Sequence, residues 1–171
     1  MPRFFKYDPV WCSAVLAFML AFATWPAKAQ RVDDGQALAG LSEVKVAFDL
    51  NVGDGKALLG RLNVIDETRQ SLIAQGVNPH VVLAFRGGAT RLVQTDIEKV
   101  RPEDRAELTK IAEKIREMSA APGVQAIEQC SLAIRQQGTA ADKVLPQIKV
   151  VGNSWISLMA YQAKGYAYIA P

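Results

Sequence analysis

The order of hydrophobic and polar positions predicts a series of strands from residue 43 onward. Residues 44–50 alternate, with apolar side chains on one face and Lys45, Ala47 and Asp49 on the other. This alternation predicts a strand whose second face is less deeply covered. Residues 80–85 are continuously apolar, which predicts a more deeply buried strand. Further strands are expected from Val124, over 148–151 and over 166–169.

Helical spacing separates these strands. Apolar residues at three- and four-residue steps follow the turn 51–56, and Gly76 is placed to end that helix. Asp54 or Asn51 is expected to cap it. Pro102 opens a second helix, and further helical pieces are expected over 132–138, around 140–145 and over 155–164. The alternation predicts an α/β fold with three layers, in which helices cover both faces of a mostly parallel, five-stranded, flavodoxin-like sheet.

The first residues have the pattern of a secretory signal peptide. Arg3 and Lys6 precede an almost wholly apolar run over 10–25, and Ala27-Lys28-Ala29 matches a small-x-small cleavage site. We expect residues 1–29 to be a signal peptide cleaved after Ala29, which would export the protein, for example to a periplasm. An uncleaved anchor is the alternative, although the run is short for a span. Residues 30–42 are expected to form a flexible leading segment, and residues 43–171 one α/β domain.

Composition narrows the classes of function. A chain of 171 residues that is 50% apolar and 22% charged has the composition of one globular domain. Its net charge of +3 is not clustered as a nucleic-acid interface requires, and no membrane association is expected after cleavage. One histidine and two cysteines are too few for a usual metal site, so no metal or cofactor is expected. Loss of Cys12 with the signal would leave Cys130 as the sole cysteine.

Polar residues follow several of the predicted strands. In a parallel sheet the carboxyl ends of the strands lie along one edge, where α/β proteins bind ligands. Cys130 stands where a strand gives way to a helix, and the partial positive charge of a helix start favours the thiolate, which is the nucleophilic form. The sequence Arg86-Gly87-Gly88 permits either a turn whose backbone approaches a ligand or a plain turn with a solvated arginine. The candidate substrate-binding residues at this edge, around Cys130 as the catalytic candidate, are Asn51, Arg86, Gly87, Gln129 and Asn153.

Four segments carry a resemblance to a known family. They are Lys45–Asp54, Val82–Gly87, Glu128–Cys130, and Val150–Asn153 with Lys164–Ala167, and their order and spacing span roughly Glu43 to Ile169. In these segments the chain resembles the DsrE/DsrF-like family of sulfur-relay proteins, specifically its exported members. The resemblance implies a DsrE-like five-stranded α/β fold, a homo-oligomer of three or six chains, and a sulfur donor or acceptor protein as partner. It also implies that Cys130 accepts and passes sulfur as a persulfide.

Three functions remain open from the residues. In the first, Cys130 is a sulfur carrier, in the manner of a sulfurtransferase. Arg86 and the helix start would stabilise the anion, and Asn51 and Asn153 would position the donor. Alternatively, the edge binds a small anion or metabolite and Cys130 is only a wall residue. In the third reading the protein is an oligomeric accessory module with an inert, buried cysteine. Four aromatic residues near the C-terminus favour an oligomer interface, namely Trp155, Tyr161, Tyr166 and Tyr168.

Overall fold

A computed structural model describes residues 1, 3 and 33–171, so the signal-peptide prediction for residues 1–29 lies almost wholly outside the described residues. Residues 34–171 form one compact unit. Its five strands make a single sheet in the order β4-β3-β2-β1-β5, and all four neighbouring pairs are parallel. The expected five-stranded parallel α/β architecture is therefore confirmed, and the carboxyl ends of the strands share one edge.

The elements follow the predicted alternation closely. The strands are β1 (Glu43–Leu50), β2 (Asn78–Phe85), β3 (Val124–Cys130), β4 (Lys149–Val151) and β5 (Ala167–Ile169). The helices are α1 (Gly35–Leu38), α2 (Gly55–Ala74), α3 (Arg105–Ser119), α4 (Ser131–Gln136) and α5 (Ser154–Ala163). Short 3-10 helices replace the irregular stretch after β2 and the helical piece expected around 140–145, and their bounds are Gly87–Leu92, Ile97–Lys99, Pro102–Asp104 and Ala141–Lys143.

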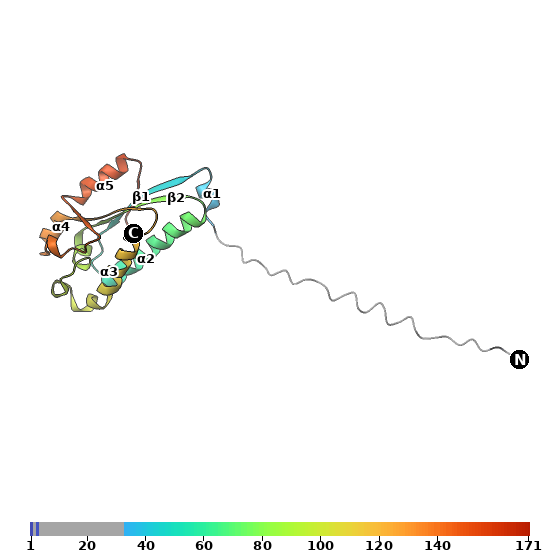
Figure 1. The fold of residues 1–171 in the computed structure, drawn as a ribbon, viewed down its shortest axis with the longest axis horizontal. Helices are drawn as coiled ribbons and strands as arrows, with labels where there is room; N and C mark the ends of the chain where they lie inside the picture. Colours follow the sequence, from blue (N-terminus) through green and yellow to red (C-terminus); the bar gives the residue numbers. More distant parts are fainter. Residues whose placement is uncertain (2, 4–32) are drawn as a thin grey trace. The chain divides into compact units, whose positions relative to one another are not determined.

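Helices cover both faces of the sheet (Figure 1). The larger core lies under α2 and α3, where Leu62, Ile111 and Phe85 are fully buried. The smaller core lies under α5 and consists mainly of alanine, valine and one anchoring leucine, Leu158. Asp49 also lies on this second face and is only 2% exposed, so the expectation of a less deeply covered face on β1 is wrong. Small side chains in the sheet allow α5 to pack close enough to cover it.

Local signals set the boundaries of α2. The Asp54 carboxylate accepts a hydrogen bond from Ala57 N at 2.7 Å, which makes Asp54 the N-cap that the sequence suggested. Gly76 adopts a φ of +79° just after the helix, a conformation that glycine adopts without the steric cost of a side chain. One helical turn, α1, forms within the leading segment. The backbone N–H of Asp34 donates to the Gln75 side chain at 2.9 Å and ties this turn to the end of α2.

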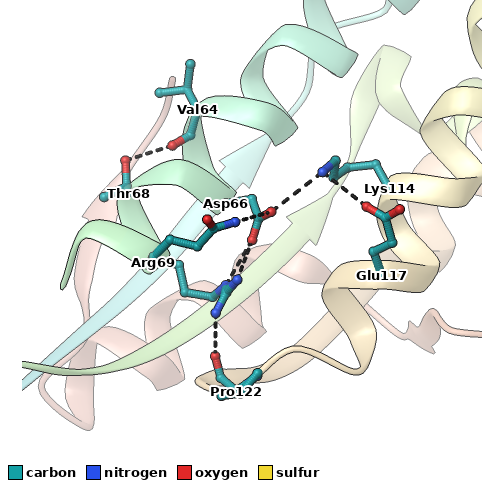
Figure 2. Close-up of polar contacts among 8 residues, drawn as sticks. Val64, Asp66, Thr68, Arg69, Lys114, Glu117 and Pro122 are labelled. Atoms are coloured by element: carbon teal, nitrogen blue, oxygen red, sulfur yellow. Dashed lines mark hydrogen bonds and ion pairs between the residues drawn. The ribbon is translucent and has the colours of Figure 1, made fainter. Parts of the chain in front are cut away.

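A buried arginine joins α2 to the neighbouring elements (Figure 2). Arg69 is 7% exposed, donates from Nε and Nη2 to Asp66, and donates from Nη1 to the Pro122 carbonyl in the turn before β3. Lys114 of α3 lies 3.6 Å from the Asp66 carboxylate and 3.2 Å from Glu117. The hydrogen bonds of Arg69 to Asp66 and to the Pro122 carbonyl offset the desolvation cost of burying these charges.

A tyrosine of α5, Tyr161, yields a prediction about alkaline pH. Burial first, and then a 3.0 Å hydrogen bond to the Glu128 carboxylate, raise the pKa of Tyr161 to about 12. An unfolded tyrosine titrates near 10, so the stability that the neutral phenol contributes is complete below about pH 10 and is lost as the pH rises through about 12. In an absorbance titration of the folded protein, Tyr161→Phe should remove the tyrosine that ionises last. If the titration of Tyr161→Phe instead lacked a tyrosine that ionises at about pH 10, this assignment would be contradicted.

None of the helices in the described part of the chain combines the length and the hydropathy needed to cross a bilayer.

Candidate functional site

A pocket of about 150 Å³ opens at the edge where β2, β3 and β4 end. The loop after β2, the first turns of α4 and α5, and the end of β3 supply its walls. Cys130 lies in this pocket and is 5% exposed. Three of the predicted binding residues also line it. The complete lining consists of Arg86, Gly87, Cys130, Leu132, Ala133, Gln136, Asn153, Ser154 and Trp155.

The surroundings of Cys130 favour its thiolate. Burial raises the pKa of the thiol, but hydrogen bonds from the backbone and the side chain of Ser154 act in the opposite direction, and their sum brings the pKa below its ordinary value. The Ser154 N–H lies 3.5 Å from Cys130 Sγ. Weaker contributions come from the N–H groups of Ala133 and Leu132 in the first turn of α4. A cysteine with a lowered pKa and an adjoining cavity has the properties of a reactive thiol.

Ser154 is the strongest polar partner of the sulfur. It begins α5, its side chain is fully buried, and its hydroxyl has no nitrogen or oxygen partner among the described residues, which leaves it available to the Cys130 sulfur. Asn153 precedes it and caps the same helix, since Asn153 Oδ1 accepts from Trp155 N at 3.0 Å. The start of α5, rather than the start of α4 alone, therefore provides the main stabilisation of a negative sulfur.

Arg86 reaches the pocket in a fixed orientation. Its Nε and Nη2 each donate to the Asp49 carboxylate at 2.6 Å, a bidentate pair. Tyr168 of β5 donates its hydroxyl to the same carboxylate at 2.6 Å. Hydrogen bonding to Asp49 raises the pKa of Arg86, which stays charged at any ordinary pH. The alternative reading of Arg86 as a solvated arginine in a plain turn is wrong.

The remaining predicted residues lie apart from the pocket. Gln129 alternates with Cys130 along β3, so it faces the opposite side of the sheet, where it is fully buried and donates to the Thr90 carbonyl at 3.4 Å. The structure therefore does not bring Gln129 to Cys130. Asn51 is exposed and does not line the pocket. It borders Gly87, because a Cβ placed on Gly87 would lie 3.6 Å from Asn51 Cβ.

Gly88 is needed for the packing of two loops. A Cβ on Gly88 would lie only 2.7 Å from Gly53 Cα, so the turns after β1 and β2 touch through their backbones. This contact fixes the position of the loop that carries Arg86 and Gly87. Of the two glycines after β2, Gly88 allows the loops to pack and Gly87 lines the pocket.

The sequence does not single out Ser154 as a partner of the sulfur, and it predicts Trp155 only for an oligomer interface. Asp49 was assigned to a poorly covered face, although a buried carboxylate in a strand signals a cationic partner. Within the described residues there is no cluster of three or more histidine, cysteine or acidic side chains that could hold a metal ion.

The fold and this site define an α/β protein with a cysteine pocket at the carboxyl edge of a parallel sheet. No known protein-family model matches the chain. A protein from Aquifex aeolicus (strain VF5), described as uncharacterized, is 27% identical over 128 residues, which are 75% of this chain and 56% of that protein. The chain therefore spans little more than half the length of this curated relative.

A solved structure shares the fold. The protein MTH1491 from Methanobacterium thermoautotrophicum, described as a protein of unknown function, superimposes with a TM-score of 0.58 at 19% sequence identity. The match covers 75% of this chain and 99% of that one. At this level of identity the likeness establishes the α/β architecture, and function must be argued from the site.

Proposed function

We propose that the protein is an exported, DsrE-like sulfur carrier in which Cys130 holds sulfane sulfur as a persulfide. The observation that carries the proposal is the hydrogen bond from Ser154 N to Cys130 Sγ inside a pocket, where burial and polar partners together leave the thiol pKa below its ordinary value. A structural cysteine needs neither an adjoining cavity nor donors directed at its sulfur.

The chemistry requires no external oxidant or reductant. The Cys130 thiolate attacks the outer, sulfane sulfur of a donor, a new S–S bond forms, and the donor's own S–S bond breaks to release its remainder as an anion. In the second step an acceptor thiolate attacks the outer sulfur of the Cys130 persulfide and releases the Cys130 thiolate. The same donors that stabilise the thiolate, namely Ser154 and the N–H groups of α4, favour its departure in this second step.

Mass spectrometry of the intact protein tests the loading step. After exposure to thiosulfate, polysulfide or a low-molecular-weight persulfide, the protein should gain one sulfur atom, and peptide mapping should locate it on Cys130. Mapping is needed because the full chain contains a second cysteine, Cys12. Absence of an adduct on Cys130 at every pH between about 6 and 9, the range in which thiols titrate, would contradict the proposal.

One observation favours a second candidate function. Cys130 is only 5% exposed, which suits an inert wall residue in a small-anion or metabolite site of an accessory module. In that case Cys130→Ser should leave ligand affinity nearly unchanged, and the thiol should react with a disulfide reagent such as Ellman's only after unfolding. Rapid reaction of the folded protein would decide in favour of the carrier.

We also propose that the protein self-associates through α5. Trp155, Ile156 and Met159 are each at least 61% exposed on this helix, which is a large apolar surface for a small domain. Of the other aromatic residues expected at an interface, Tyr161 and Tyr166 pack against each other, with ring centroids 5.1 Å apart. Sedimentation equilibrium should give the mass of a trimer or hexamer; a monomeric mass that persists at high concentration would rule out this assembly.

A further inference from the structure

We propose that the Cys130 pocket selects a small sulfane donor that carries an oxyanion, of the thiosulfate type, and that Arg86 and Asn153 recognise its oxygens. This inference rests on the proposed function and names the class of donor for the same site. It depends on the size of the pocket, on the polarity of its lining, and on the way in which Arg86 is held.

The pocket matches a small donor in size. A cavity of about 150 Å³ holds a molecule of roughly six heavy atoms, the size of benzene. Thiosulfate is of this size, whereas a tripeptide persulfide would have to leave most of its atoms outside. Leu132 and Trp155 border the pocket with apolar surface and offer no ionic contact to a peptide carrier. The Ser154 hydroxyl is fully buried, has no nitrogen or oxygen partner among the described residues, and lies beside the sulfur that the donor approaches.

The lining offers hydrogen-bond donors and lacks carboxylates. Asn153 uses its carbonyl oxygen to cap α5, which leaves its amide N–H₂ to face a ligand. Arg86 uses Nε and Nη2 on Asp49, and its Nη1 makes no hydrogen bond to any residue that the structure describes. Among the described residues, no aspartate or glutamate lines the pocket. A concave site with an arginine, amide groups and no acid suits an anion with several oxygens.

Arg86 is also pre-organised for this task. Its partner Asp49 is 2% exposed and is held in turn by Tyr168, so the guanidinium does not need to be ordered when the donor binds. Asp49 and Tyr168 are thus positioning residues for the anion contact. Because Asp49 neutralises most of the long-range charge of Arg86, the recognition depends on short hydrogen bonds and is directional.

The transfer step balances with thiosulfate as donor. The Cys130 thiolate attacks the sulfane sulfur, the S–S bond of thiosulfate breaks, and sulfite leaves with the electron pair of that bond. Charge is conserved, since a thiolate and a dianion become a persulfide anion and a dianion. The oxygens of the departing sulfite are the groups that Arg86 and Asn153 hold, so these contacts can persist through bond cleavage.

The test compares two small donors that differ in their oxyanion. Rate constants for persulfide formation on Cys130 are measured by stopped-flow and mass spectrometry with thiosulfate and with the hydrogen disulfide anion, which has no oxygens. Arg86→Gln should lower the ratio of the thiosulfate to the hydrogen disulfide rate constant by roughly tenfold to a hundredfold, the usual effect of a lost hydrogen bond to a charged group. Arg135→Gln is the matched control. It removes one positive charge from an exposed position on α4 that does not line the pocket, and it should leave the ratio unchanged.

A second variant keeps the test decisive if Arg86→Gln unfolds. Asn153→Ser retains a capping oxygen for α5 but removes the amide donor, and it should lower the same ratio by about tenfold. Sulfite binding to Cys130→Ser, measured by titration calorimetry, gives an independent readout and should disappear when Arg86→Gln is added.

The outcomes separate this inference from the proposed function. Equal losses for both donors in Arg86→Gln and Asn153→Ser would overturn oxyanion selection while leaving the persulfide carrier intact. Failure of both donors to load Cys130 in the wild type, with sulfite still bound through Arg86, would support the anion pocket and defeat the carrier. Persulfide formation from a protein donor but not from thiosulfate would overturn the inference in favour of a macromolecular donor.

Discussion

Cys130→Ser should abolish sulfur transfer from a sulfane donor to a thiol or cyanide acceptor, and the rate should fall to that of the uncatalysed reaction. A serine hydroxyl cannot form a persulfide, and no other residue of the pocket can take over as a sulfur nucleophile. The measurement is the rate at which acceptor sulfur appears with the purified variant. Residual transfer above the background would contradict the assignment of Cys130 as the carrier.

The fold of this variant must be checked at the same time. Serine is slightly smaller than cysteine and can accept the hydrogen bond from Ser154 N, so the thermal midpoint should change little. Cys12 provides the matched comparison in the full chain, because it is the second cysteine of the sequence. Cys12→Ser should keep full transfer. If Cys12→Ser lost transfer while Cys130→Ser retained it, the sulfur carrier would be Cys12 and not the pocket cysteine.

Asp49→Ala should produce the largest loss of stability among single substitutions at the site, about 3–5 kcal/mol. The Asp49 carboxylate accepts two hydrogen bonds from Arg86 and one from Tyr168 while its side chain is 1% exposed. Removing it leaves the guanidinium, three-quarters buried, without its counterion. Urea denaturation monitored by circular dichroism measures the change in the free energy of unfolding.

Two further variants separate the ion pair from simple packing. Tyr168→Phe removes one hydrogen bond at a half-exposed position and should cost about 1 kcal/mol. Asp49→Leu combined with Arg86→Leu removes both charges, and it should recover a large part of the stability that Asp49→Ala loses. A cost below about 1 kcal/mol for Asp49→Ala would mean that the pair is solvated and that Arg86 is not held in place.

The fold could be predicted because its signals are local and repeated. Strands such as β2 are continuous apolar runs, and the ends of α2 carry their own cap and glycine, Asp54 and Gly76. The order of the strands could not be predicted from these patterns. The position of β1 between β2 and β5 depends on pairing between segments that are far apart in the sequence. The same holds for the burial of Asp49, which depends on the position of α5 over the sheet.

The site could be predicted only in part for a geometric reason. The ends of parallel strands meet at one edge, so Arg86, Gly87 and Asn153 were expected beside Cys130, and the structure places them there. Gln129 is also near the end of β3, but alternation along the strand directs its side chain to the face opposite Cys130, so nearness to the strand end alone does not place a residue in the pocket. The role of Ser154 depends on where α5 begins relative to the sulfur, which only the folded chain defines.

The most direct test of the account is the pH dependence of Cys130 alkylation in the folded protein. The rate of reaction with a neutral reagent such as iodoacetamide reports the thiolate fraction, and the account predicts an apparent pKa below the value that the same reaction gives for the unfolded protein. Ser154→Ala, which removes only the hydroxyl, should move the apparent pKa of Cys130 upward. A wild-type pKa at or above that of the unfolded protein, or a thiol that reacts only after unfolding, would contradict the claim that this pocket holds a reactive sulfur.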